Sequence, residues 1–217
     1  MKQDIQNILV IGANGSTGQL ICDILADSPG YRPVAMVRKE SQKKQFEEKN
    51  IRIVLGDLEE DFEHAFENID KVIFAAGAGG SSSDEKTIAV DQEGAKKSVD
   101  LAKKYHLKKY VMLSSMGAEN PDEDSDLYKY LKAKHNADEY LKASGLEYTI
   151  VRPGGLTDDK GQGKIKAEQS FDESGKISRE DVAKTLVHVL AHEVAHNSHF
   201  EILAGDVQID EAVLQIS

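Results

Sequence analysis

The glycine-rich stretch near the start of the chain constrains the fold more than any other part of the sequence. An apolar run, Ile8–Ile11, is typical of a buried strand, and Gly12, Gly15 and Gly18 follow it at three-residue spacing. Residues 19–25 then place their apolar side chains on one side of a helix. A strand, a glycine turn and a helix in this order present the N-terminus of the helix to a phosphate group.

Each glycine has a distinct expected role. Gly12 can adopt a backbone angle closed to other residues, so the chain turns sharply off the strand. Gly15 lets the backbone approach a pyrophosphate, and Gly18 lets the helix pack close to the strand. The GxxGxxG spacing is one residue off the GxGxxG dinucleotide fingerprint, and no Gly-Lys-Ser/Thr follows, which excludes a Walker A loop. The residues expected to hold the dinucleotide are Gly12, Asn14, Gly15, Ser16, Thr17 and Gly18.

Apolar runs continue to alternate with helical patterns along the chain. Five more strands are expected, at residues 33–38, 51–55, 71–76, 109–115 and 147–152. Helices are expected at residues 39–49, 60–68, 85–105 and 127–144. This alternation is typical of the α/β class and predicts a Rossmann-like doubly wound parallel sheet with helices on both faces.

The C-terminal part of the sequence is less regular. Residues 164–169 are expected to form a short strand, and a helix with Ser178 as its N-cap is expected to run to about His192. Phe200–Leu203 is the expected last strand. No linker or repeat divides the chain, so residues 1–217 are expected to form a single NAD(P)-binding Rossmann domain, in which residues from about 156 form a short substrate-side extension.

Charge and composition exclude several classes of protein. The net charge of −11 argues against a nucleic acid or an acidic membrane as a partner. The lone Cys22 excludes an intramolecular disulfide and a multi-cysteine metal site. No apolar run approaches 18 residues and no secretory leader opens the sequence, so we expect a cytoplasmic protein.

The residues that follow each strand are the candidate cofactor ligands, because doubly wound sheets bind ligands across the carboxyl ends of their strands. Arg38 follows the second strand, where an acidic residue would suit NAD and an arginine suits the 2′-phosphate of NADP. We therefore expect NADP(H) to be preferred over NAD(H). The structural alternative for Arg38 is a solvated charge at a strand end.

The third and fourth strands are followed by further candidates. Asp57 can hydrogen-bond to the adenine and Leu58 can pack against it, and Asp57 can equally serve as a helix N-cap. Ala75, Ala76 and Gly77 are small enough to let a cofactor lie against the backbone. The following residues, up to Ser83, are too rich in glycine and serine for regular structure.

Five segments together resemble one superfamily. They are residues 12–18, 56–58, 113–117, 130–134 and 144–154, with the sequences GANGSTG, GDL, LSSMG, YLKAK and SGLEYTIVRPG. On these motifs, and over nearly the whole chain, the sequence resembles the short-chain dehydrogenase/reductase superfamily, in its atypical, NmrA-like branch of NAD(P)-binding proteins.

The resemblance implies a catalytic group of serine, tyrosine and lysine, which matches Ser115, Tyr130 and Lys134, with Ser114 as the alternative serine. The tyrosine hydroxyl would exchange a proton with the substrate. The lysine, one helical turn further on, would hold the nicotinamide ribose, and the serine would hydrogen-bond to the substrate carbonyl oxygen. The backbone atoms that would meet the nicotinamide carboxamide belong to Pro153 and Gly154.

A second pair, Tyr128 with Lys132, has the same YxxxK spacing. Tyr130 and Lys134 are preferred because their register to residues 138–146 matches the family pattern better. Tyrosine and lysine are common on amphipathic helices, so a YxxxK pair is also expected there without any catalytic role.

We therefore expect an NADPH-dependent oxidoreductase that reduces a small carbonyl, a quinone or a similar acceptor. Two alternatives stay open: a non-catalytic NADP(H)-binding redox sensor or assembly factor, and an epimerase or isomerase that holds its nicotinamide cofactor tightly. The expected partner is a small-molecule substrate, without nucleic acid or membrane, and the expected state is a monomer or a homodimer.

The sequence also contains His192-Glu193-Val194-Ala195-His196, which fits the HExxH motif of zinc proteases. We expect no metal here, because the helix should end before His196 and so separate the two histidines. His199 lies only three residues after His196, which is not a known spacing for a third ligand.

Overall fold

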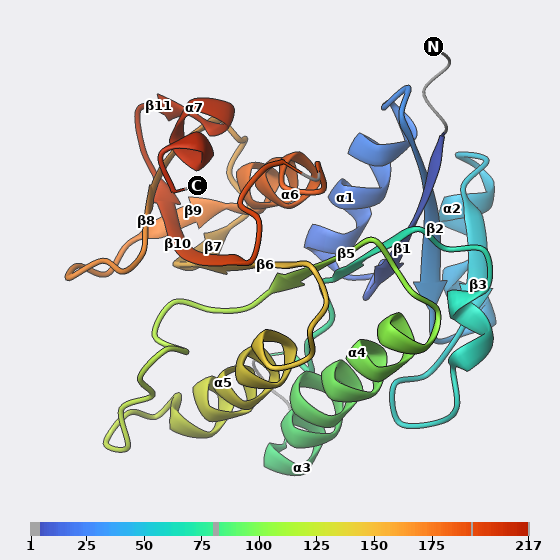
Figure 1. Ribbon diagram of the computed structural model, residues 1–217, viewed down its shortest axis with the longest axis horizontal. Coiled ribbons are helices and arrows are strands. Elements are labelled where there is room, and N and C mark those ends of the chain that lie inside the picture. Colours follow the sequence, from blue (N-terminus) through green and yellow to red (C-terminus); the bar gives the residue numbers. More distant parts are fainter. Residues whose placement is uncertain (1–4, 80–82, 192, 217) are drawn as a thin grey trace.

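The computed structural model describes residues 5–79, 83–191 and 193–216, and in this part of the chain a nine-stranded sheet forms the centre of the molecule (Figure 1). Its strand order is β3-β2-β1-β4-β5-β6-β10-β8-β11. The strands from β3 to β10 run parallel, and β8 and β11 add an antiparallel edge. The strands are β1 (Gln6–Ile11), β2 (Tyr31–Val37), β3 (Arg52–Leu55), β4 (Lys71–Phe74), β5 (Lys109–Leu113), β6 (Tyr148–Pro153), β8 (Lys164–Glu168), β10 (Ser198–Ala204) and β11 (Val207–Gln208).

Successive strand residues point to opposite faces, so the sheet has two apolar faces, and helices cover both. Ile8 and Val10 of β1 belong to one core, and Leu9 and Ile11 to the other. The helices are α1 (Ser16–Ala26), α2 (Lys44–Glu47), α3 (Asp84–Thr87), α4 (Ala95–Lys104), α5 (Tyr128–Lys142), α6 (Arg179–His188) and α7 (Ile209–Leu214). Figure 1 shows α1 and α6 on one side of the sheet and α3, α4 and α5 on the other. This arrangement confirms the predicted doubly wound sheet.

Three predicted helices differ from the observed ones. Residues 60–68 contain only the 3-10 turn Glu63–Phe66, because the backbone is already extended at Glu67. Residues 39–49 form a 3-10 turn followed by the short helix α2. Residues 85–105 are helical, but the π-helical turn Ile88–Gly94 separates α3 from α4.

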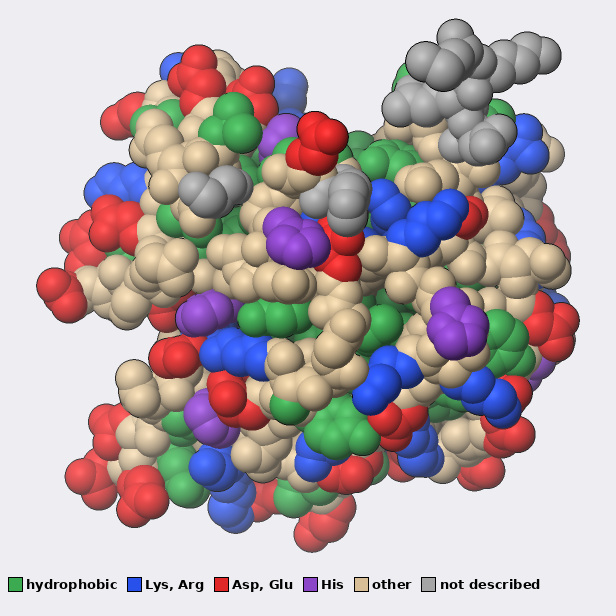
Figure 2. Space-filling model, viewed as in Figure 1, with side chains coloured by type: hydrophobic (Ala, Val, Ile, Leu, Met, Phe, Trp, Pro, Cys, Tyr) green, Lys and Arg blue, Asp and Glu red, His purple; other side chains and the backbone are tan. Residues whose placement is uncertain are grey.

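The C-terminal part contains more structure than predicted. The strand expected at 164–169 is β8, but the strand expected to be last, β10, is followed by β11 and α7. A separate two-stranded sheet of β7 (Gly155–Thr157) and β9 (Lys176–Ser178) was not predicted, because strands this short show no apolar periodicity. Figure 2 shows an indentation at the left edge of the molecule, between this part of the chain and α5.

Helix α6 begins as expected and ends earlier. The Ser178 hydroxyl accepts the Asp181 N–H (3.0 Å) and donates to the Asp181 carboxylate (2.9 Å), so it is the predicted N-cap. The helix ends at His188, and the predicted end near His192 lies outside the described residues.

Two buried lysines bind backbone carbonyls just after the end of α6. Lys71, the first residue of β4, donates to the Leu190 carbonyl at 2.6 Å. Lys109, the first residue of β5, donates to the carbonyls of Ala191 and Val194, at 2.9 and 2.7 Å. Burial lowers the pKa of Lys109 to about 8, and the Glu147 carboxylate 3.5 Å away opposes this only in part. The amino ends of β4 and β5 are therefore covered by residues that follow α6.

Candidate functional site: a dinucleotide cavity at the strand switch point

The carboxyl ends of β1 and β4 meet where the strand order reverses, because β1 pairs with β2 on one side and with β4 on the other. Gly12 turns the chain off β1 with a φ of +85°, a conformation that disfavours any side chain. A Cβ on Gly12 would lie 2.6 Å from backbone atoms of Ala76. The two strand ends thus approach closely at the point where doubly wound sheets bind their ligands.

Gly15 and Gly18 shape the start of α1. Gly15 is the N-cap residue, and no side chain caps the helix, so its first N–H groups are left for another acceptor. A Cβ on Gly18 would overlap the carbonyl oxygen of Gly12 and lie 2.8 Å from Ala13 Cα. The loop therefore needs a glycine at position 18 for packing, and position 15 faces the open side.

A cavity of about 390 Å³ opens in front of this loop. Nine of the predicted cofactor residues line it: Gly12, Asn14, Gly15, Arg38, Asp57, Leu58, Ala75, Ala76 and Gly77. The residues that line it without having been predicted are Ile11, Met36, Val37, Gln42, Gly56, Ala78, Lys86 and Val90. Four of these, Ile11, Val37, Gly56 and Ala78, directly adjoin predicted residues, so longer strand-end segments would have included them. Of the other predicted loop residues, Ser16 is exposed at the start of α1, whereas Thr17 and Gly18 are buried.

A larger hollow, of about 590 Å³, lies at the amino ends of β1, β2 and β3. It is lined by residues such as Asn7, Arg32 and Arg52, and it contains neither a glycine loop nor the N-terminus of a helix. The cavity beside the glycine loop is therefore the better candidate for a dinucleotide, although it is the smaller of the two.

Gln42 shapes the cavity at the end of β2. Its side-chain oxygen accepts the backbone N–H groups of Arg38 (2.9 Å) and Lys39 (3.0 Å), which fixes the backbone and leaves the Arg38 side chain exposed at the cavity. Gln45 of α2 donates to the Asn14 side chain at 2.8 Å and so joins α2 to the glycine loop. A cation beside the end of β2 suits a 2′-phosphate.

Asp57 forms a turn in the structure and does not cap a helix. Its carboxylate accepts the Glu59 N–H at 3.1 Å, and the next helical turn begins only at Glu63. Leu58 is buried beside it. The helix N-cap that the sequence allowed for Asp57 is thus not observed.

Lys134 lies where β4 and β5 end. Its Nζ is 2.9 Å from Asp91 Oδ1 and donates to the carbonyls of Ala76 and Leu113, each at 3.4 Å. Both partners of the ion pair are buried, with 3% of Lys134 and 1% of Asp91 exposed. Burial alone would lower the pKa of Lys134, but Asp91 together with Tyr130 and Asp138 outweighs burial, and the pKa is raised. The ammonium group therefore stays charged at physiological pH.

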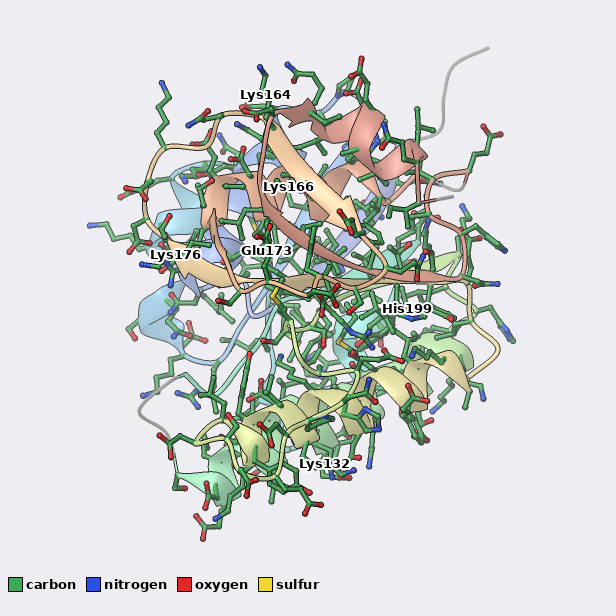
Figure 3. The ribbon with its side chains drawn as sticks, turned by 90° about the vertical axis from the view of Figure 1, so that its left-hand side faces the viewer. Lys132, Lys164, Lys166, Glu173, Lys176 and His199 are labelled. Atoms are coloured by element: carbon green, nitrogen blue, oxygen red, sulfur yellow. The ribbon has the colours of Figure 1, made fainter. Side chains whose placement is uncertain are left out.

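The two YxxxK pairs have different surroundings. The Lys134 ammonium lies 5.8 Å from the ring centroid of Tyr130, and both residues are on α5. Lys132 is exposed on the same helix (Figure 3). Of the two lysines, Lys134 is the one that reaches the strand end at Ala76, which lines the cavity.

Ser114 and Ser115 also differ. The buried Ser114 hydroxyl donates to Asp138 Oδ2 at 2.9 Å, and the same oxygen accepts from Arg152 Nε at 3.0 Å. Burial raises the pKa of Asp138, although the Arg152 charge opposes the shift. Ser115 is half-buried, and its hydroxyl makes a 3.3 Å bond to the Met116 carbonyl. Ser114 thus belongs to a buried ion-pair network, and Ser115 makes a weaker local contact.

The backbone of Pro153 and Gly154 already has protein partners. The Pro153 carbonyl accepts the Met116 N–H at 3.0 Å, and the Gly154 N–H donates to the Ile202 carbonyl at 3.1 Å. A nicotinamide carboxamide at this position would therefore donate to the remaining lone pairs of the Pro153 and Gly154 carbonyl oxygens.

The described residues of the HExxH segment are not helical. Helix α6 ends at His188, Ala195 has a φ of +47°, and His196 lies 3.4 Å from Glu147. His192 is outside the described residues. Within the described ranges no three His, Cys, Asp or Glu side chains gather as metal ligands. In the same part of the chain, no helix combines the length and the apolar character needed to cross a membrane.

The fold defines a class of protein: a Rossmann-like α/β protein, here with a cavity at its strand switch point. Residues 12–193 match the NAD(P)H-binding family, and the chain belongs to that family.

Its relatives include both epimerase-like and reductase proteins. YhfK of Bacillus subtilis strain 168, described as an uncharacterized sugar epimerase, is 40% identical over 213 residues, which are 96% of this chain and 99% of YhfK. Sanguinarine reductase of Eschscholzia californica is 30% identical over 251 residues, covering 94% and 91% of the two chains. A solved structure from Bacillus halodurans, provisionally described as an NAD-dependent epimerase/dehydratase, is 41% identical with a TM-score of 0.93, over 97% of this chain and 99% of that one.

Proposed function

We propose that the protein is an NADPH-dependent oxidoreductase that reduces a small carbonyl, a quinone or a similar acceptor. The observation that carries the proposal is the cavity at the switch point, which joins the glycine loop and Arg38 and adjoins the strand end where the charged Lys134 is held. The proposal includes membership of the atypical, NmrA-like short-chain dehydrogenase/reductase branch, a cytoplasmic location, and a monomeric or homodimeric state.

The residues that line the cavity suit the adenosine and pyrophosphate parts of the cofactor. The uncapped N-terminus of α1 and the missing Cβ of Gly15 suit a pyrophosphate, and the exposed Arg38 suits a 2′-phosphate. Asp57 and Leu58 border the place expected for the adenine, and the small residues Ala75–Gly77 leave room at the end of β4. When bound, NADPH would supply the hydride.

The side chains near Lys134 suit the proton transfer. Tyr130 would donate its hydroxyl proton to the substrate oxygen and regain a proton from water. Ser115 would donate a hydrogen bond to the same oxygen as negative charge develops on it. Lys134, charged and held by Asp91, would bind the ribose hydroxyls and stabilise negative charge on Tyr130.

Titration of the purified protein with NADPH and NADH, followed by nicotinamide fluorescence, tests the cofactor proposal. Arg38→Ala should lose roughly tenfold or more in NADPH affinity and keep its NADH affinity, since a hydrogen bond to a charged group contributes about 1.5–3 kcal/mol. Lys39→Ala is the matched control, because Lys39 is the next residue and also exposed, but does not line the cavity. Equal NADPH affinity in the Arg38 variant and the wild type would refute the role of Arg38.

A panel of carbonyl and quinone acceptors tests the reaction. Tyr130→Phe and Ser115→Ala should lower the turnover of an accepted substrate by about two orders of magnitude or more, and Tyr128→Phe should leave it unchanged. NADPH binding without turnover of any acceptor would favour the non-catalytic redox sensor or assembly factor.

An epimerase is the second candidate function, because YhfK and the Bacillus halodurans protein are both described in those terms. An epimerase returns the hydride to its substrate and therefore has to retain the oxidised cofactor between turnovers. If denaturing the purified protein releases nicotinamide nucleotide in an amount equal to that of the protein, this candidate is favoured over the reductase.

A further inference from the structure

A buried carboxylate, Asp91, lies beside the lysine at the end of the cofactor cavity. Asp91 comes from the π-helical turn Ile88–Gly94, which joins α3 to α4. Turns of this kind are rare in helices and frequently occur at functional sites. Here Val90, Asp91 and Gly94 are all buried, so the turn directs a charged side chain into the protein. A carboxylate buried in this way requires a partner of opposite charge.

The two oxygens of Asp91 bind groups from two different segments. Oδ1 lies 2.9 Å from Lys134 Nζ, and Oδ2 accepts the Ala78 N–H at 2.8 Å. Oδ1 accepts no hydrogen bond of good geometry from the described residues, so charge attraction holds it to the lysine. Ala78 belongs to the segment after β4 and lines the cavity. A Cβ on Gly77 would lie 3.2 Å from Oδ1, so this segment passes close over the carboxylate.

The ammonium group of Lys134 has three N–H donors. Two of them make long bonds, each 3.4 Å, to the carbonyls of Ala76 and Leu113. A ribose hydroxyl could replace either carbonyl at little cost, because bonds of this length are weak. The 2.9 Å ion pair with Asp91 is the contact that would persist in the complex.

We propose that Asp91 is a positioning residue for the cofactor: it holds the Lys134 ammonium and the Ala78 backbone in place, so that the lysine meets the nicotinamide ribose. This inference rests on the proposed NADPH-binding function. The other titratable groups that face Lys134 are Tyr130 and Asp138, both on α5, and Asp138 is already paired with Arg152. Asp91 is therefore the carboxylate committed to Lys134.

Asp91→Asn tests the proposal, because it removes the charge and keeps the shape. We expect its dissociation constant for NADPH at pH 7 to rise about tenfold or more. We also expect the affinity to fall further from pH 7 to pH 9, since a buried lysine without its carboxylate loses its proton more easily. The wild-type affinity should stay constant over this range. Glu93→Gln is the matched control, an exposed acid of the same π-helical turn.

Asp91→Glu keeps the charge and moves the carboxylate, and it serves as the second variant where Asp91→Asn does not fold. It should bind NADPH more weakly than the wild type but with an affinity that is constant from pH 7 to pH 9. Thermal unfolding of each variant separates stability from binding. A variant that is only less stable, with wild-type affinity and pH profile in its folded form, would show a merely structural role and overturn the proposal.

The outcomes also separate this inference from the function on which it rests. A wild-type protein that does not bind NADPH removes both. A wild-type protein that binds NADPH, with Asp91→Asn and Asp91→Glu indistinguishable from Glu93→Gln in affinity and pH profile, removes the role of Asp91 and leaves the proposed function intact.

Discussion

Replacement of Gly15 or Gly18 by alanine separates the two roles assigned to the glycine loop. Both substitutions add one methyl group, three residues apart, to the same loop. At Gly18 the new Cβ would overlap the Gly12 carbonyl oxygen and crowd Ala13 Cα, which is 2.8 Å away. At Gly15 the nearest atom, the same carbonyl oxygen, is 3.3 Å away, and the φ of −70° is open to any residue. Gly18→Ala should therefore damage the fold, and Gly15→Ala the cofactor site.

The magnitudes follow from the two environments. Alanine inside a helix is favoured over glycine by about 1 kcal/mol. Overpacking costs about 1–3 kcal/mol and more where backbone atoms must move, as they must at Gly18. A net loss of about 2 kcal/mol lowers the melting temperature of a domain of this size by about 4–8 °C. For Gly15→Ala, the weaker N-cap and the lower entropy of the unfolded chain nearly cancel, so stability should change by less than about 1 kcal/mol.

The binding assay should give the opposite order. The Gly15 methyl group would occupy the side of the loop where a pyrophosphate approaches, and we expect NADPH affinity to fall at least tenfold. Thermal unfolding and fluorescence titration of the two variants measure both quantities. An unchanged NADPH affinity in Gly15→Ala, or an unchanged melting temperature in Gly18→Ala, would refute this reasoning about the loop.

Three further predictions concern groups away from the cavity. Burial raises the pKa of the Cys22 thiol to about 12 and leaves the thiol without exposed surface. Cys22 should therefore react with a thiol reagent at pH 8 only as fast as the chain unfolds. Rapid labelling of the native protein would contradict this. The pKa of Lys109 is about 8 in the folded protein and 10.5 in a free side chain. The unfolded chain therefore holds this proton more tightly, and the contribution of Lys109 to stability rises with pH between these two values. The unfolding free energy of wild type minus that of Lys109→Met should therefore increase by about 2 kcal/mol from pH 8 to pH 10, and a flat difference would contradict the lowered pKa. Ser178→Ala removes the N-cap of α6 and should cost about 1 kcal/mol in denaturant unfolding, whereas the exposed Ser174→Ala should cost almost nothing.

The features predicted correctly are those with a local signature in the sequence. The strand, glycine loop and helix at residues 8–25 combine two clear periodicities with residues of special backbone freedom, and the structure contains each of them. The edge of the cavity could be predicted for a related reason. Once the strands are known to be parallel, their carboxyl ends have to lie together, which brings Arg38, Asp57 and Ala75 to one cavity.

The features that the sequence did not predict depend on contacts between distant segments. Asp91 stands in a polar stretch that is typical of an exposed helix face, and only the π-helical turn directs it inward to Lys134. No buried role is predicted for Asp138 from the sequence, but its carboxylate pairs with Arg152 of β6 below the surface. The helix predicted at residues 60–68 had suitable apolar spacing, but tertiary packing overrode that local preference.

The lysines at the amino ends of β4 and β5 also affect the order in which the molecule can be completed during synthesis. The bond from Lys71 to the Leu190 carbonyl joins residues 119 positions apart, and the bond from Lys109 to the Ala191 carbonyl joins residues 82 positions apart. A nascent chain that ends after β6 already contains the whole glycine loop, but its two lysines lack the carbonyl acceptors that follow α6, and burying their charges would be costly. The N-terminal half should therefore remain incompletely closed until residues 190–194 have left the ribosome, and the dinucleotide site should reach its final stability only then.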